Sequence, residues 1–243
     1  MRNENNMKEL MDSWSSEARE NGELDFIRDG LLNNMEFGHW EESKLRITFI
    51  AKEPYFRNHG TFEKGGLAGQ DYCEYDILNL SVNNRFWRNI LAWTYGIHHT
   101  DRNNDYPDYE KAVDLNSRQL VVKEIPISLV NIKKEAGASY TLSHDLRSYL
   151  RRYKQYLKKE LLEILRPNIV FCCGNYDIVM DEIYDDYDFG QIDDDGFVYY
   201  CKDQDILLIA GYHPTARMSN YQMYDSVMSA YSDFLEDYNF PSN

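Results

Sequence analysis

The sequence predicts one α/β domain of three layers, in which helices cover both faces of a central four-stranded parallel sheet. Four short apolar runs, rich in β-branched and aromatic residues, are typical of buried strands and lie at residues 47–50, 127–130, 168–173 and 206–210. Helical patterns separate these runs, and strands that alternate with helices form parallel sheets covered on both sides. A length of 243 residues without an obvious linker fits a single domain over residues 1–243.

The helices are placed by the spacing of apolar residues and by end signals. Two amphipathic helices, at residues 6–20 and 23–34, are expected to cover the sheet as an N-terminal unit within residues 1–40. Five more are expected at residues 85–95, 109–122, 145–165, 176–184 and 221–238. Gly96 is expected to end the first of these five helices, and Arg166-Pro167 the third. Residues 181–203 are expected to form an acidic insertion that includes an edge strand at residues 197–201.

The charge distribution bears on the kind of partner. A net charge of −15 argues against a general affinity for nucleic acid, because phosphate binding depends on Lys and Arg. Residues 133–166, however, contain nine Lys or Arg against four Asp or Glu, while acid concentrates at residues 181–195. The basic stretch favours either a local rim for DNA or a helix face that is only solvated. The acidic segment is a candidate surface for a protein partner.

The remaining composition predicts a protein of the cytoplasm without a membrane contact. No apolar signal region or run of about 18 apolar residues is present. The four cysteines have no CxxC spacing and are interpreted as reduced core residues. No P-loop, GxGxxG or HExxH motif occurs, so neither a cofactor nor a metal site is expected.

Polar side chains follow the predicted strands at the points where the strands end. Glu53 follows the first strand, Asn131 the second and His213 the fourth. Because ligands of parallel α/β sheets bind beyond the carboxyl ends of the strands, these side chains are expected to share a site. The alternative is structural: a surface glutamate in a turn, an asparagine that caps a loop, and a histidine held within a loop.

The order of these motifs resembles that of the uracil-DNA glycosylase superfamily over roughly residues 45–235. The family pattern of a strand followed by a Gly-Gln-Asp-Pro-Tyr-like motif is similar to Ala51-Lys52-Glu53-Pro54-Tyr55, and its His-Pro-Ser loop is similar to His213-Pro214-Thr215. Gly174-Asn175 follows the third strand. The resemblance implies a uracil-DNA glycosylase-like fold and a base-excising activity without metal or cofactor.

The resemblance also implies a role for each motif. Glu53 would stabilise the cationic sugar and orient water, while a neutral His213 would donate a hydrogen bond to the departing base. Asn131 would read the base through its amide, and Tyr55 would crowd the 5-position; without the family they are a loop cap and a packed aromatic. Gly69 stands where the family carries a base-stacking Phe, so that ring would come from Phe56, Phe62 or Tyr72.

A duplex substrate would have to be flipped into such a pocket, and Arg217 or Met218 lies where the family carries its insertion loop. Lys133 and Lys134 would meet DNA phosphates at the same rim, and the basic helix at residues 147–159 would extend the contact. Three functions stay open. They are a DNA glycosylase for uracil or a related damaged or modified base, an inactive member that binds a nucleobase, nucleotide or protein, and a hydrolase of free nucleosides or nucleotides.

Overall fold

The computed structural model describes residues 2–23, 26–54, 71, 76–101, 103–135 and 142–242. Its centre is a seven-stranded sheet in the order β1-β3-β2-β4-β7-β6-β5. The strands are β1 (Gly30–Leu31), β2 (Ile47–Ala51), β3 (Ile127–Asn131), β4 (Ile169–Cys172), β5 (Gly190–Gln191), β6 (Val198–Cys201) and β7 (Ile206–Ile209). The predicted α/β class is therefore confirmed.

The sheet is mixed and seven-stranded, so the prediction of a purely parallel sheet of four strands was wrong. The four predicted strands form the middle of the sheet and pair in parallel, in the order β3, β2, β4 and β7. Antiparallel pairings add β1 on one side and β6 and β5 on the other. β1 and β5 have two residues each, which is too short for a pattern of alternating side chains to be read.

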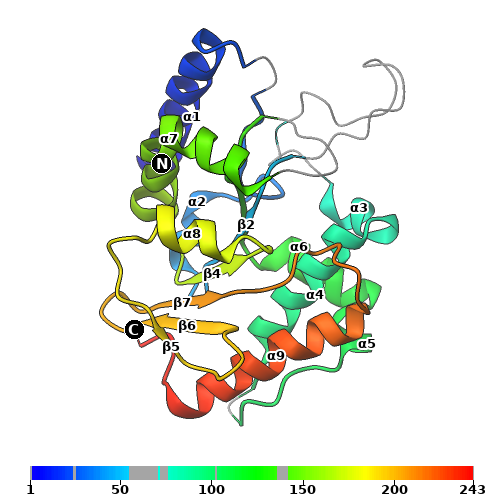
Figure 1. The fold of residues 1–243 in the computed structure, drawn as a ribbon. Helices are drawn as coiled ribbons and strands as arrows, with labels where there is room; N and C mark the ends of the chain where they lie inside the picture. The colour runs from blue at the N-terminus through cyan, green and yellow to red at the C-terminus, as the bar shows by residue number, and fades with distance from the viewer. Residues whose placement is uncertain are drawn as a thin grey trace.

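Helices cover both faces of the sheet (Figure 1). One layer contains α3 (Ile77–Asn83), α4 (Arg85–His99), α5 (Tyr109–Ala112), α6 (Leu115–Glu124) and α9 (Asn220–Asp237). The other contains α1 (Arg2–Glu20), α2 (Phe37–Glu42), α7 (Ser143–Lys158), the π-helix η2 (Lys159–Leu165) and α8 (Tyr176–Glu182). Alternate residues of β2 enter the two cores, with Phe49 facing the first layer and Ile50 the second.

Some predicted helices do not form, extend further than expected or are divided. The described residues of the stretch 23–34 do not form a helix, because Gly30 takes a φ of +120° and Gly30–Leu31 joins the sheet as β1. Gly96 does not end α4; a Cβ there would lie 2.6 Å from the sulfur of Met228, so this glycine permits close packing of α4 on α9. The predicted helix at residues 109–122 is divided into α5 and α6, and Asp114 caps the second piece.

The long basic helix predicted at residues 145–165 changes its geometry along its length. It is α-helical as α7 and continues as η2, which ends at Arg166 in the left-handed conformation, with φ at +48°. Within the described ranges, no helix has the combination of length and apolar character that crossing a bilayer requires.

Candidate functional site

The carboxyl ends of β2, β3 and β4 are held together at one edge of the sheet. Pairing continues past the strands, since the backbone N–H of Ile132 donates to Ala51 and that of Lys133 donates to Lys52, each at 2.9 Å. On the other side of β2, the N–H of Cys173 donates to Ile50 at 2.9 Å. These bonds place Glu53 beside the segment that follows β3, as the position of both at strand ends predicted.

Glu53 is a half-buried carboxylate among charged neighbours. Burial raises the pKa of Glu53, and the positive charge of Lys133 acts in the opposite direction. Asp145 and Glu135 raise the same pKa further, whereas Lys52 lowers it. Lys133 forms an ion pair with Glu135 at 3.0 Å, so its charge is shared between two carboxylates. The arrangement keeps a partly desolvated carboxylate within the field of two lysines.

His213 lies in the loop after β7 and is neutral at pH 7. Burial lowers its pKa below the ordinary value, and the charge of Lys52 lowers the pKa further. The backbone N–H of Thr215 donates to Nδ1 of His213 at 3.2 Å, and Thr215 Oγ1 lies 2.9 Å from the same atom. Since a backbone N–H can only donate, Nδ1 carries no hydrogen, and the neutral ring has its N–H at Nε2. His213 is therefore a donor through Nε2.

Two side chains of α4 hold the loop that carries His213. Asn89, buried at 2% exposure, donates to the carbonyl of Pro214 at 2.7 Å. Arg85 donates to the carbonyl of Met218 and, at 2.5 Å, to Asn220. Sequence reasoning missed Arg85 and Asn89, although polar residues on the inward face of an amphipathic helix are a recognisable signal.

Two glycines bring the same loop against the sheet. A Cβ on Gly211 would lie 2.2 Å from the ring of Phe171 in β4. Gly174 takes a φ of +69°, and a Cβ there would lie 3.2 Å from the backbone nitrogen of His213. The close approach at both positions fixes the start of the loop relative to β4.

Asn131 lies at the end of β3 and is 1% exposed. Its backbone N–H donates to Oδ2 of Asp29 at 2.7 Å, and its Nδ2 donates to the same oxygen at 3.0 Å. Asn175, after β4, similarly uses Nδ2 to donate to the carbonyl of Ile50 at 3.1 Å. Among the described residues, the amide oxygens of Asn131 and Asn175 are buried and accept no hydrogen bond. Two amide acceptors thus lie on either side of β2.

Lys134 lies in the interior, so the expectation that it meets DNA phosphates is corrected. Its ammonium group pairs with Asp29 and, at 2.8 Å, with Glu160 of η2; all three side chains have 0% exposure. Burial raises the pKa of Glu160, and the charge of Lys134 acts against this rise. Because Asp29 and Glu160 are far from Lys134 in sequence and no motif marks them, sequence reasoning had no signal for this cluster.

The other predicted contacts are divided between the described and the undescribed parts of the chain. Arg217 is exposed, whereas Met218 is half-buried against the core. Lys133 is partly accessible at the edge, with 22% of its side chain exposed. The predicted base-binding residues Tyr55, Phe56 and Tyr72 lie outside the described residues, as do Phe62 and Gly69.

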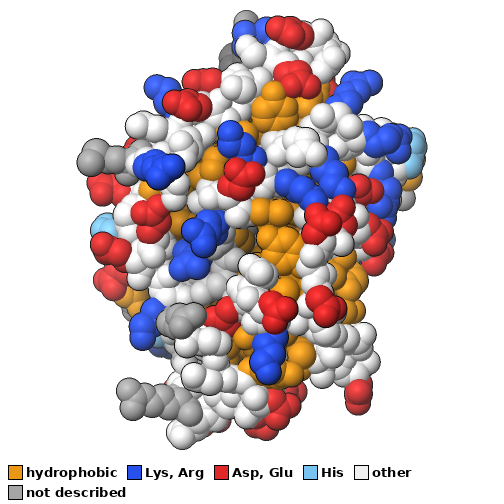
Figure 2. Space-filling view, turned by 90° about the vertical axis from the view of Figure 1, so that its left-hand side faces the viewer, with side chains coloured by type: hydrophobic (Ala, Val, Ile, Leu, Met, Phe, Trp, Pro, Cys, Tyr) orange, Lys and Arg blue, Asp and Glu red, His pale blue; other side chains and the backbone are white. Residues whose placement is uncertain are grey.

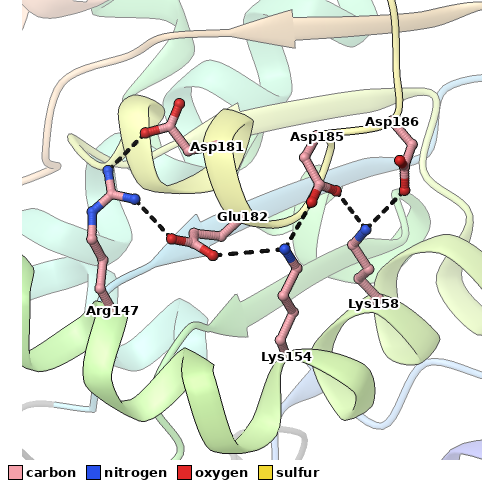
Figure 3. A network of polar contacts seen from close by, with 7 residues as sticks. All are labelled: Arg147, Lys154, Lys158, Asp181, Glu182, Asp185 and Asp186. Carbon is pink, nitrogen blue, oxygen red and sulfur yellow. Dashed lines mark hydrogen bonds and ion pairs between the residues drawn. The ribbon is translucent and has the colours of Figure 1, made fainter.

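The basic helix is paired with the acidic segment (Figure 3). Arg147 bonds Asp181 and Glu182 at 2.8 Å each. The ammonium groups of Lys154 and Lys158 lie 2.8 and 2.5 Å from Asp185. Figure 2 shows this side of the molecule, where Lys and Arg side chains are interspersed with Asp and Glu. Three of the positive charges that were predicted to contact DNA along this helix are therefore already paired with carboxylates.

A surface cavity of about 740 Å³ lies at the other end of β2. It is lined by residues that include Leu45, His98, Asp101, Tyr231 and Phe240. Leu45 precedes β2 and Glu53 follows it, so this cavity is separate from the edge that carries the candidate site. Within the described ranges, no group of three His, Cys, Asp or Glu side chains is arranged to hold a metal ion.

Comparison of the sequence with models of known protein families gives no match, and comparison with curated proteins gives none that is significant.

Proposed function

We propose that the chain is a base-excising hydrolase of the uracil-DNA glycosylase type, with Glu53 and His213 as its catalytic pair. The observation that carries the proposal is the state of His213: a neutral ring whose Nδ1 accepts from Thr215 and whose Nε2 carries the hydrogen. A donor of this kind, at the same sheet edge as a half-buried carboxylate, suits cleavage of an N-glycosidic bond.

His213 would stabilise the departing base. Breaking the bond between sugar and base places negative charge on the base, and its carbonyl oxygen becomes the best acceptor in the site. The hydrogen bond from a preorganised N–H to that oxygen is stronger in the transition state than in the ground state. Removing such a donor typically costs about 10²- to 10³-fold in rate. Arg85 and Asn89 support this role because they hold the loop in place.

Glu53 would stabilise the other half of the transition state. The sugar gains cationic character as the base leaves, and an ionised carboxylate lowers the energy of that cation and orients the attacking water. Burial raises the pKa of Glu53, so activity is expected to rise with pH as this carboxyl loses its proton. The proximity of Lys133 and Lys52 favours the ionised form.

The test is base release from labelled single- and double-stranded oligonucleotides that contain uracil, hypoxanthine, hydroxymethyluracil or thymine. Alkaline cleavage at abasic sites reports the product. Glu53→Ala and His213→Ala are expected to lose activity by at least about 10²-fold. The matched controls are Glu42→Ala and the exposed His144→Ala, which are expected to act like the wild type. Full activity of either site variant would contradict the assigned roles.

The ion pairs of Figure 3 favour a second candidate, the hydrolysis of free nucleosides or nucleotides. They neutralise part of the basic helix on a chain of net charge −15, and a small substrate does not need a long basic surface. Release of base from deoxyuridine or its monophosphate, together with weak and salt-insensitive DNA binding, would favour this candidate. A steep loss of oligonucleotide binding with salt would favour the glycosylase.

Binding of a base without release, in the wild type, would instead indicate the inactive binding member of the fold. The unpartnered amide oxygens of Asn131 and Asn175 support base recognition in either case, because both are acceptors without a donor among the described residues.

A further inference from the structure

Asp29 is a buried carboxylate that lies immediately before β1 and touches Asn131. Its Oδ2 receives two hydrogen bonds from Asn131, at 2.7 Å from the backbone nitrogen and 3.0 Å from Nδ2. Its Oδ1 receives the ammonium group of Lys134. Both oxygens of Asp29 are thus occupied by donors.

These contacts determine which way the amide of Asn131 faces. A carboxylate only accepts, so the NH₂ group of Asn131 must be turned toward Asp29. The flipped amide would place Oδ1 against a carboxylate oxygen in the protein interior, where two acceptors repel each other. Oδ1 therefore faces away from Asp29, and it has no donor among the described residues.

A buried acceptor without a donor is costly, because it has lost its hydrogen bond to water and gains none from the protein. This unsatisfied acceptor lies at the carboxyl end of β3, beside the segment that carries Glu53. An unsatisfied and rigidly oriented acceptor at that position is suited to a ligand that brings its own N–H.

We propose that Asp29 is a positioning residue, which locks the amide of Asn131 so that its oxygen accepts from a ring N–H of the bound base. The inference rests on the proposed function, because it concerns recognition at the same site. Uracil and hypoxanthine carry a hydrogen on the ring nitrogen next to a carbonyl, whereas cytosine and adenine present a bare nitrogen acceptor. Selectivity between these two classes then depends on Asp29, which does not contact the base.

Lys134 holds Asp29 in its place, and Glu160 is the second carboxyl partner of the same ammonium group. Lys134 links Asp29 to Oε2 of Glu160, and the ammonium also lies 4.9 Å from the ring centroid of Trp14 in α1. Glu160 bonds Lys134 rather than Asn131, so Glu160→Gln perturbs the same cluster without acting on the amide directly. It is the matched control for a change at Asp29.

The test uses proteins that also carry Glu53→Gln, so that oligonucleotides bind without losing their base. Affinities are measured for single strands with uracil, N3-methyluracil or cytosine at one position. The protein with Asp29 intact is expected to prefer uracil over both others by at least about tenfold. Asp29→Asn frees the amide to turn, and the preference is expected to fall to within about threefold, whereas Glu160→Gln keeps it. An unchanged preference in a folded Asp29→Asn protein would overturn the positioning role alone.

A second measurement covers the case in which Asp29→Asn does not fold. In the wild type labelled with ¹⁵N-asparagine, the side-chain NH₂ of Asn131, assigned through an Asn131→Asp variant, is expected to exchange with solvent far more slowly than exposed asparagines. Fast exchange would overturn the lock. If the protein with Asp29 intact bound none of the strands and the wild type released no base, the proposed function would fail, and the base-reading role of Asp29 with it.

Discussion

Two clusters of charge in this molecule use the same residue types in opposite surroundings. In the interior, Lys134 stands between Asp29 and Glu160, with 0% of each side chain exposed. At the surface, Arg147, Lys154 and Lys158 of α7 face the carboxylates of α8 and of the segment that follows it. The interior cluster is costly to break because water cannot replace a lost partner, whereas the surface cluster is solvated and screened by salt.

A charge count along the chain therefore does not distinguish a binding surface from a structural cluster. Lys133 and Lys134 are neighbours in sequence, yet Lys133 is partly exposed and pairs with Glu135, whereas Lys134 is buried between Asp29 and Glu160. The difference comes from their tertiary partners.

The largest effect is expected for removal of the buried cation. Lys134→Met leaves the buried side chains of Asp29 and Glu160 without their ammonium partner, which typically costs about 3–5 kcal/mol in the free energy of unfolding. Urea denaturation followed by circular dichroism measures this cost. Lys158→Met, which removes a lysine from the surface cluster, is the control and is expected to cost no more than about 1 kcal/mol. Equal costs for the two variants would refute the distinction between the clusters.

An intermediate effect is expected from titration of the buried cluster. Burial raises the pKa of Glu160 to about 8 from an ordinary value of 4.5. The folded state therefore holds a proton that the unfolded state releases, so this contribution to stability is complete below about pH 4.5 and is lost as pH rises toward about 8.

Glu160→Gln removes this titration. The difference in unfolding free energy between wild type and variant is expected to change by at least about 1 kcal/mol between about pH 5 and pH 8, with the wild type relatively more stable at the lower pH. Denaturant melts at a series of pH values test this, and parallel pH profiles for the two proteins would show that Glu160 ionises normally.

The smallest effect is expected at the surface cluster. Arg147→Ala breaks the pairs with Asp181 and Glu182 and is expected to cost between about 0 and 1 kcal/mol at low salt, with the difference shrinking in about 1 M NaCl. Thermal melts at two salt concentrations suffice. A salt-independent loss above about 2 kcal/mol would place Arg147 in a structural role like that of Lys134.

The sequence predicted the four central strands and the strand ends that carry Glu53, Asn131 and His213, because uninterrupted apolar runs and their polar ends are local signals. It did not predict β1, since two residues carry no periodicity. The end of α4 was misplaced because a glycine commonly ends a helix. The residue that requires glycine at position 96 is Met228 of α9, which is distant in sequence.

The candidate site also combines residues that local sequence signals predict with residues that they do not. The residues named from strand ends lie at one edge, whereas the residues that hold them, Asp29 for Asn131 and Asn89 for the His213 loop, come from other elements. Only long-range packing brings these supports into place. Lys134 shows the opposite outcome. Its neighbours in sequence suggest an exposed residue, whereas its partners in the folded protein are buried.

The close approach of Gly211 to Phe171 has an evolutionary consequence. Phe171 also stacks on Trp93 of α4, with ring centroids 4.7 Å apart, and lies 5.0 Å from Phe49. Any side chain at position 211 would displace that ring, and any change of the ring would remove the support on which the His213 loop begins. Positions 171 and 211 are therefore expected to be inherited together, and lineages that exchange one are expected to exchange the other.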